Sequence, residues 1–310
     1  MLKPIKLANK NFLSSLDISS EEFFHILEIA KNFKNKDLNI ELKDKVLGLI
    51  FDKSSTRTRV SFQVAMSRLG GTTIDLNPTT SQIGRGEPIK DTARVLSRYC
   101  DVLAIRTYNH SDLEEYAKWS RKPIINALTD LEHPCQALAD FLTIKEEFGG
   151  FENVTLTFIG DGNNVANSLI LCGALLGAKI RIACPCGYEP NEFVLKQAMK
   201  INQSSDFLTV MNDPQIAAED ANVLYTDVWS SMGEENQKKE KDKDFNGFTI
   251  DNNLINKANK DAIVLHCLPA YRGKEITDEV IDSKLSRIFE QAENRLHVQQ
   301  ALLSCMLYSN

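Results

Sequence analysis

The hydrophobic residues of this chain fall into short apolar runs that alternate with stretches of helical spacing. Apolar runs of four to six residues predict buried β-strands at 46–51, 102–105, 124–127, 154–159, 180–184, 223–226 and 263–266. Apolar positions three or four residues apart predict helices at 21–34, 60–69, 91–98, 136–148 and 165–176. This alternation is typical of an α/β fold in which helices cover parallel sheets.

Two segments interrupt the alternation. A predicted helix ends at Phe148 and is followed by Gly149 and Gly150, which makes this point the best candidate for a domain boundary. With 310 residues, the chain is long enough for two domains. The charged run EENQKKEKDKD at 234–244 has no apolar period, so we expect a mobile surface loop that can also serve as a lid.

Composition narrows the functional classes. The net charge of −6 argues against a nucleic-acid-binding protein, which needs a basic surface. No stretch approaches the roughly 18 apolar residues of a membrane span, and the first residues lack a secretory apolar core, so we expect a soluble cytoplasmic protein. The seven cysteines are scattered and odd in number, which indicates buried free thiols in a reducing compartment.

The segment DKSSTRTRVSF at 52–62 carries the first candidate chemistry. It lies between a predicted strand and a predicted helix, where the unpaired N–H groups of a helix start attract anions. Its hydroxyl groups can donate hydrogen bonds, and Arg57 or Arg59 can hold two phosphate oxygens at once. The alternative is a serine N-cap followed by solvated arginines. Two arginines within one turn favour a phosphate or carboxylate site.

Polar residues follow further predicted strands. Arg106 comes directly after one strand, at the edge where α/β sheets bind ligands. His133 and Gln136 lie three residues apart at a helix start and can face one ligand, although a structural histidine that caps the loop fits equally well. Asp227 ends another strand and precedes a tight polar loop.

Two later segments suggest cofactor or thiol chemistry. The segment FIGDGNNVANS at 158–168 lacks the third glycine of G-x-G-x-x-G, so its paired asparagines are better interpreted as readers of a small polar ligand. In IVLHCLPAYRG at 263–273, Cys267 stands at a strand end. If the pleat of that strand continues, His266 and Cys267 point to opposite faces, which argues against a Cys–His hydrolase.

Together these segments resemble the ornithine carbamoyltransferases, a branch of the aspartate/ornithine carbamoyltransferase family. The main motifs are Ser55-Thr56-Arg57-Thr58-Arg59, His133-Pro134-Cys135-Gln136, Asp227 with Ser231-Met232-Gly233, and His266-Cys267-Leu268-Pro269. Supporting motifs are Gln82-Ile83-Gly84-Arg85-Gly86-Glu87-Pro88, Asp161-Gly162-Asn163-Asn164 and Glu293-Asn294-Arg295-Leu296. Seven motifs in order cover nearly the whole chain, so the resemblance is specific.

The resemblance implies a fold and an assembly. Two doubly wound α/β domains with parallel sheets are expected, the first at 1–148 for carbamoyl phosphate and the second at 149–290 for ornithine. The active site would lie in the cleft between them, and a C-terminal helix at 291–310 would return to the first domain. The family's usual assembly implies a homotrimer or a larger assembly of trimers. Neither a metal nor an organic cofactor is implied.

The resemblance also assigns roles to residues. Those implied to bind carbamoyl phosphate are Ser55, Thr56, Arg57, Thr58, Gln82, Arg106, His133, Gln136, Cys267, Leu268 and Arg295. Those implied to bind ornithine are Asn164, Asp227, Ser231 and Met232. Arg57, Arg106, His133 and Cys267 are implied to be catalytic.

The implied reaction moves the carbamoyl group of carbamoyl phosphate to the δ-amine of L-ornithine, giving L-citrulline and phosphate in arginine metabolism. Attack forms a tetrahedral oxyanion, which Arg57, Arg106 and His133 would stabilise while phosphate leaves. If the pKa of the amine resembles that of lysine, removing its proton at pH 7 costs roughly 4–5 kcal/mol. Cys267 as a thiolate can accept that proton or orient the amine.

Three alternatives stay open at this point. Aspartate carbamoyltransferase shares the first two motifs but typically has a lysine within the loop found here at 82–88 and a Pro-Leu-Pro-Arg turn at 266–269. Putrescine carbamoyltransferase is closer, and it differs in whether Asp227 and Asn164 meet an amino-acid head group. A non-catalytic binding protein on this fold loses Arg57 or Cys267, and both are present. The residues do not distinguish arginine synthesis from arginine breakdown.

Overall fold

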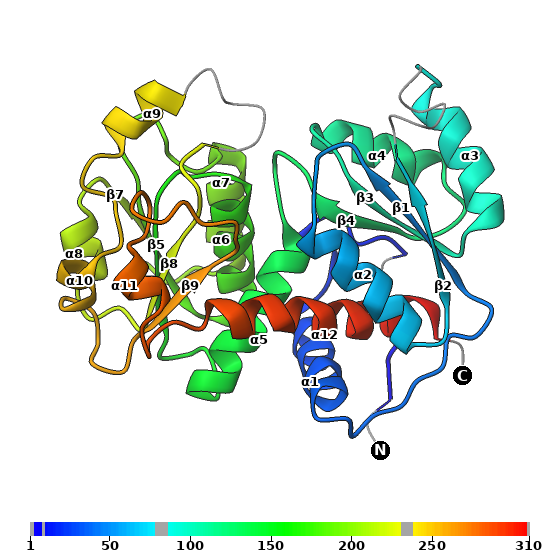
Figure 1. The fold of residues 1–310 in the computed structure, drawn as a ribbon, viewed down its shortest axis with the longest axis horizontal. Coiled ribbons are helices and arrows are strands. Elements are labelled where there is room, and N and C mark those ends of the chain that lie inside the picture. The colour runs from blue at the N-terminus through cyan, green and yellow to red at the C-terminus, as the bar shows by residue number, and fades with distance from the viewer. Residues whose placement is uncertain (1–2, 8–9, 78–85, 231–237, 309–310) are drawn as a thin grey trace. The chain divides into compact units, whose positions relative to one another are not determined.

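The computed structural model describes residues 3–7, 10–77, 86–230 and 238–308, which form two compact units (Figure 1). The first unit comprises Met1–Leu142 and Glu293–Asn310, and the second comprises Thr143–Ala292. Helix α5 (Pro134–Phe148) carries the chain out of the first unit, and the C-terminal helix α12 (Ile288–Leu307) carries it back. The first unit therefore contains both ends of the chain.

The first unit is built on a four-stranded parallel sheet with the strand order β2-β1-β3-β4. Its strands are β1 (Val46–Phe51), β2 (Thr72–Leu76), β3 (Val102–Arg106) and β4 (Ile124–Leu128). Strands β1, β3 and β4 are almost wholly buried, as their continuous apolar runs predict. Strand β2 lies at the edge of the sheet and is largely exposed.

Helices cover this sheet. They are α1 (Ser20–Lys34), α2 (Arg57–Arg68), α3 (Ile89–Tyr99) and α4 (His110–Trp119), preceded by the short 3-10 helix η1 (Ser15–Asp17). Helices α3 and α4 lie together on one face (Figure 1), where Ala93, Leu113 and Tyr116 join Ile50 and Leu103 in one buried cluster. Because the strands are apolar, their side chains pack with those of α3 and α4 into one core.

The second unit has a five-stranded parallel sheet with the order β7-β6-β5-β8-β9. Its strands are β5 (Thr155–Ile159), β6 (Lys179–Ala183), β7 (Leu208–Met211), β8 (Val223–Thr226) and β9 (Ile263–His266). Its helices are α6 (Asn164–Leu176), α7 (Glu192–Ile201), α8 (Pro214–Ala218), α9 (Lys238–Asp244), α10 (Asn252–Ile255) and α11 (Asp278–Ile281).

The predicted α/β class with parallel sheets is confirmed, while several predicted limits are wrong. Helix α2 begins at Arg57 and α5 at Pro134, earlier than the predicted starts at 60 and 136, because the first turn of α2 is polar and α5 starts at a proline. Strand β3 extends one residue further, to Arg106. Residues 238–244 form helix α9 where a loop was expected, and residues 234–237 lie outside the described part.

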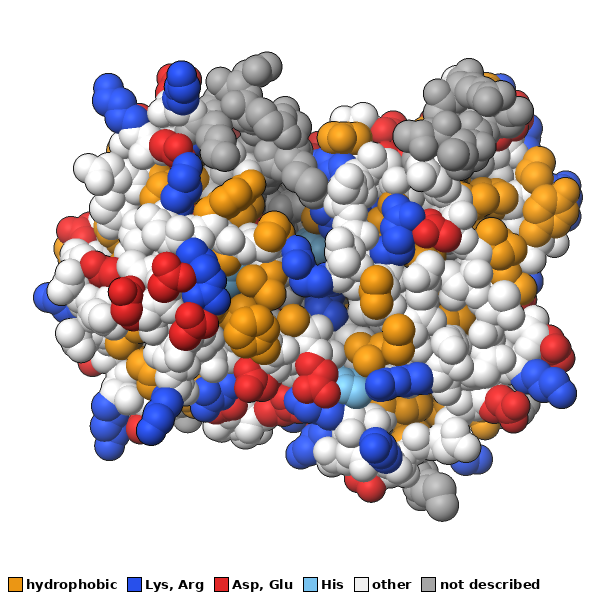
Figure 2. Space-filling view, in the orientation of Figure 1, with side chains coloured by type: hydrophobic (Ala, Val, Ile, Leu, Met, Phe, Trp, Pro, Cys, Tyr) orange, Lys and Arg blue, Asp and Glu red, His pale blue; other side chains and the backbone are white. Residues whose placement is uncertain are grey.

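The surface carries charges of both signs. Figure 2 shows basic and acidic side chains intermixed over the coloured part of the visible face. Some of them pair directly, as Arg272 does with Asp278 and Asp282 at 2.8 Å and 2.7 Å. Among the described residues, the helices are too short or too polar to cross a membrane.

Candidate active site

Each sheet has one point at which the chain reverses its direction of strand addition. In the first unit the chain passes from β1 to β2 and then returns to β3 on the other side of β1. In the second unit it passes from β5 through β6 to β7 and then returns to β8 on the other side of β5. Because open α/β sheets bind ligands at the carboxyl ends of the strands beside such a point, the loops after β1, β3, β5 and β8 are expected to bind ligands.

The loop after β1 leads into the start of helix α2. Thr56 is the N-cap residue, and no side-chain hydrogen bond from the described residues caps this helix. The first N–H groups of α2 can therefore receive an anion. Ser55 lies in the same loop, half-buried, with Arg57 exposed in the first helical turn.

The two arginines of this turn are not equivalent. Arg59 Nη1 lies 2.7 Å from Asp75 Oδ2, and its guanidinium carbon lies 5.1 Å from the centroid of the Phe51 ring. Among the described residues, Arg57 has no such ion pair. Arg57 is therefore the arginine of this loop that can turn to a ligand.

A second cluster, here called the arginine site, comprises Thr58, Arg106, His133, Gln136 and Arg295, all nine-tenths or more buried. Arg295 of α12 donates through Nη2 to Thr58 Oγ1 at 2.7 Å and through Nη1 to Gln136 Oε1. Gln136 Nε2 donates in turn to Asp140 Oδ1 at 2.8 Å. One guanidinium thus ties together α2, α5 and α12, whose residues are far apart in the sequence.

Arg106 and His133 complete this site. The carbonyl of Arg106, the last residue of β3, accepts from Asp52 N at 2.8 Å, which joins β3 to the loop after β1. Burial, followed by the positive charges of Arg295 and Arg106, holds the pKa of His133 well below its usual value. His133 is therefore neutral near pH 7, and a neutral imidazole has one N–H to donate and one nitrogen to accept.

Glu132, which the sequence analysis did not single out, supports the loop that carries His133. Its carboxylate is 1% exposed and accepts from the hydroxyl of Ser14, from Ser15 N at 3.1 Å and from Ser15 Oγ at 2.7 Å. The residues around η1 therefore hold a loop that lies 117 residues further along the chain. Nothing in the local pattern at 132 indicates such a partner.

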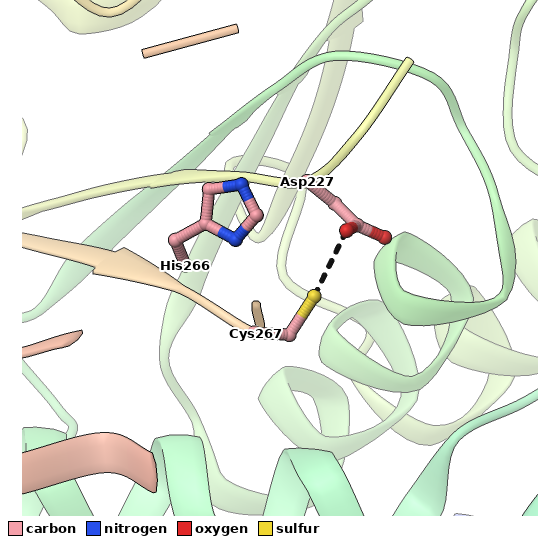
Figure 3. Close-up of side chains that lie close together, drawn as sticks. All are labelled: Asp227, His266 and Cys267. Carbon is pink, nitrogen blue, oxygen red and sulfur yellow. Dashed lines mark hydrogen bonds between the residues drawn. The ribbon is translucent and has the colours of Figure 1, made fainter. Parts of the chain in front are cut away.

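The second unit holds a smaller cluster, here called the carboxylate site, which comprises Asn163, Asp227 and Cys267. Asp227 Oδ2 accepts from Asn163 Nδ2 at 2.9 Å. Asp227 Oδ1 accepts from Val228 N at 2.8 Å and from Cys267 Sγ at 2.9 Å, as Figure 3 shows for the thiol. The Asp227 side chain, from the loop after β8, is thus oriented by its own loop and by groups on two other segments.

Asn163 is one of the paired asparagines that the sequence pattern suggested as ligand readers, whereas the resemblance assigned a role to Asn164 alone. Asn163 Oδ1 caps α6 by accepting from Val165 N at 2.9 Å and Ala166 N at 3.2 Å, which leaves Nδ2 to donate to Asp227. Asn164 is the first residue of α6 and half-buried. An asparagine directly before an apolar helix is an N-cap signal, so the sequence did contain an indication of its position.

A buried ion pair fixes the loop that carries Asn163. Lys241 of α9 is 5% exposed, and its Nζ lies 2.6 Å from Asp161 Oδ2. Gly162 is required next to it, because a Cβ there would lie 2.4 Å from Pro190 N. Helix α9 is therefore anchored to the loop that carries Asn163, where the sequence predicted a mobile surface loop.

The condition for His266 and Cys267 to point to opposite faces is not met, because β9 ends at His266 and its pleat does not continue. Ligand atoms of Asp227, His266 and Cys267 lie within 4.8 Å of one another (Figure 3), so these three are the described residues that could together hold a metal ion. However, His266 Nδ1 accepts from Leu268 N at 2.8 Å and Nε2 lies 3.1 Å from Glu275 Oε1. A metal would have to displace one of these partners.

Three residues assigned by resemblance, Gln82, Ser231 and Met232, lie outside the described residues. Of the others, Thr58, Gln136 and Arg295 are joined by hydrogen bonds, with His133 and Arg106 close enough to interact electrostatically. In the second unit, Asp227 and Cys267 are in direct contact.

Comparison with known proteins assigns the class. The sequence model described as the carbamoyl-P binding domain of aspartate/ornithine carbamoyltransferase matches residues 10–146, and the one described as the Asp/Orn binding domain matches residues 152–306. The chain belongs to the aspartate/ornithine carbamoyltransferase family.

Individual relatives are similar over their full lengths. The chain is 78% identical to an ornithine carbamoyltransferase of Prochlorococcus marinus subsp. pastoris, over 99% of this chain and 100% of that protein. The structure of ornithine carbamoyltransferase from Pyrococcus furiosus superposes with a TM-score of 0.93 at 48% identity, covering 98% of each chain. That from Gloeobacter violaceus gives a TM-score of 0.89 at 46% identity, covering 97% of this chain and 99% of the other.

Proposed function

We propose that this chain transfers the carbamoyl group of carbamoyl phosphate to the δ-amine of L-ornithine, producing L-citrulline and phosphate. The observation that carries this proposal is the 78% identity, over 99% of the chain, to a relative named ornithine carbamoyltransferase. The two clusters support it, because one is rich in cations and the other is centred on a carboxylate. Such a pair suits one anionic and one cationic substrate.

Carbamoyl phosphate is assigned to the first unit. Its phosphate would be held by the start of α2 and by Ser55, Thr56, Arg57 and Thr58, with Gln82 as a further contact. Arg106 and His133 would donate to the carbonyl oxygen, where negative charge grows as the tetrahedral intermediate forms. Because its pKa is held low, His133 can donate a hydrogen bond there as a neutral group.

Ornithine is assigned to the second unit. Asn164, Asp227, Ser231 and Met232 would hold its α-amino and α-carboxylate groups, with Cys267 and Leu268 beside the reacting amine. The amine must lose a proton before it attacks, and Cys267 Sγ, 2.9 Å from Asp227 Oδ1, offers a route from the amine to a carboxylate. Gln136 would accept from the carbamoyl amine group, and Arg295 orients that amide.

An assay with a panel of acceptors tests this assignment. Phosphate release from carbamoyl phosphate is measured with L-ornithine, L-aspartate, putrescine and acetylornithine. We expect ornithine to be preferred over aspartate, because the 7% exposed carboxylate of Asp227 would face a dicarboxylic substrate. Faster turnover with aspartate or putrescine would show that this acceptor is the substrate and that ornithine is not.

We also propose a cellular compartment and a metabolic role for the reaction. All seven cysteines are free and five are buried, which favours the reducing cytoplasm. A neighbour at 43% identity is described as an anabolic ornithine carbamoyltransferase from Campylobacter jejuni, which favours a role in arginine biosynthesis.

By resemblance we propose a homotrimer with domains at 1–148, 149–290 and a returning segment at 291–310. Light scattering coupled to gel filtration would measure the assembly.

A further inference from the structure

The turn after β9 contains a backbone conformation that leucine seldom adopts. Leu268 has φ of 57°, in the left-handed region where a side chain crowds the backbone. Its N–H donates to Nδ1 of His266, two residues earlier, at 2.8 Å. This hydrogen bond closes the turn around Cys267, so the position of the thiol depends on the imidazole.

The hydrogen bonds of His266 also define its tautomer. A backbone N–H can only donate, so Nδ1 must carry the lone pair and Nε2 must carry the proton. Nε2 lies 3.1 Å from Oε1 of Glu275, which accepts as well from Tyr271 N. His266 and Glu275 are each 1% exposed. Glu275 therefore holds the imidazole in the tautomer that Leu268 requires.

The backbone of His266 is fixed from a different direction. His266 N donates to Gln291 Oε1 at 2.9 Å, and Gln291 Nε2 donates to the Tyr225 hydroxyl at 3.1 Å. The end of β9 is thus anchored independently of the imidazole. A change in the side chain of His266 should act on the residues after it, while the strand itself is retained.

We propose that His266 is a positioning residue, whose Nδ1 holds the left-handed turn at Leu268 and so places Cys267 Sγ against Asp227 (Figure 3). Glu275 acts one step further back by fixing the proton on Nε2. Neither residue touches the reacting atoms. The kinetic consequences rest on the proposed function, whereas the placement of the thiol does not.

Two substitutions test the hydrogen bonds of Nδ1 and Nε2 separately. His266→Asn keeps an acceptor near the position of Nδ1 and removes the group at Nε2. His266→Gln reaches the position of Nε2 and removes the acceptor near Nδ1. We expect kcat to fall about 10- to 100-fold in His266→Gln and within about 5-fold in His266→Asn, with the KM for carbamoyl phosphate little changed in both. The reverse order would show that the bond to Glu275 alone matters and would overturn the proposal.

A thiol measurement tests the same point without any substrate. The full chain is treated with iodoacetamide, and alkylation of Cys267 is compared with that of the exposed Cys186 in the same sample by mass spectrometry. Because a thiol released from a carboxylate ionises more readily, the ratio should rise about 5-fold in His266→Gln and stay near wild type in His266→Asn. An unchanged ratio in His266→Gln would overturn the proposal, even if the acceptor were not ornithine.

The wild-type chain provides a measurement that does not depend on variant folding. Nitrogen NMR of labelled histidine should identify Nδ1 of His266 as the unprotonated nitrogen and Nε2 as the protonated one. A proton on Nδ1 would leave Leu268 N without its acceptor and would contradict the assigned role.

Discussion

The arginine site and the carboxylate site lie at the same kind of place in their sheets, yet they are assembled differently. The arginine site draws residues from α2, β3, α5 and α12, and the bond from Arg295 to Thr58 spans 237 residues. The carboxylate site draws its three residues from loops after β5, β8 and β9. The first is organised by a guanidinium that donates to neutral oxygens, and the second by a carboxylate that accepts from neutral donors.

This difference shows how one topology can serve two ligands of opposite charge. In both units, the reversal of strand order leaves the loops at the carboxyl ends of the adjacent strands open to a ligand. The sign of the ligand is then decided by the side chains placed there. A substitution in one unit should therefore act mainly on the ligand assigned to that unit.

The largest effect is expected at the loop after β1. Arg57→Gln removes the arginine available to phosphate, so kcat/KM for carbamoyl phosphate should fall about 10³-fold or more. Arg59→Gln is the matched control, because Arg59 is already paired with Asp75 on the surface, and a loss below about 10-fold is expected. Steady-state kinetics measure both. Equal losses would show that the two arginines share the ligand.

The next effect tests the bridge made by Arg295. Arg295→Lys keeps the charge but cannot donate to Thr58 and Gln136 in the same planar arrangement. We expect kcat/KM for carbamoyl phosphate to fall about 100-fold. The double variant with Thr58→Val should be less than additive by about 1 kcal/mol. Strict additivity would mean that the hydrogen bond to Thr58 contributes nothing to the site.

In both units, the sequence predicted the buried strands but missed a partly exposed strand at one edge of the sheet. Buried strands such as β1 and β8 were found because a continuous apolar run has few other interpretations. Edge strands β2 and β7 were missed, since TTIDL and LTVM are short and partly exposed. The first turn of α2 is polar and has no apolar spacing, so the pattern does not predict it as helical.

The sites themselves were predicted mainly through motif resemblance. Local pattern reasoning placed Arg57 at a helix start and Asp227 at a strand end, but it could not join Arg295 to Thr58. Contacts between distant segments depend on strand order, which no local pattern specifies. Asn163 and Glu132 act through hydrogen bonds to other polar groups, and such bonds leave no periodic trace in the sequence.

We expect the free energy of unfolding to depend on pH because of His133, which lies in the first unit. The pKa of His133 is about 6.5 in the unfolded chain and well below that in the folded chain. Below pH 6.5 the unfolded state therefore binds a proton that the folded state does not. The free energy of unfolding should fall with decreasing pH by up to about 1.4 kcal/mol per unit until the folded pKa is reached.

Urea unfolding between pH 8 and pH 5 measures this contribution as the difference between wild type and His133→Gln. Arg295→Met should raise the pKa of His133 and weaken the dependence, because it removes one of the two positive charges. Arg295→Lys keeps that charge and should leave the dependence in place. Identical slopes in wild type and His133→Gln would exclude His133 as the source.

The smallest effect separates the two functions of Asn163. Asn163→Ser keeps an N-cap acceptor for α6 but cannot reach Asp227 Oδ2, so the KM for ornithine should rise about 5- to 10-fold through loss of one hydrogen bond. Stability should change by less than about 0.5 kcal/mol, whereas Asn163→Ala should lose about 1 kcal/mol more by uncapping the helix. The KM for carbamoyl phosphate, assigned to the other unit, should stay constant in both variants. If the serine variant keeps the wild-type KM for ornithine, Asn163 is a helix cap alone, and the orientation of Asp227 comes from Val228 N and Cys267.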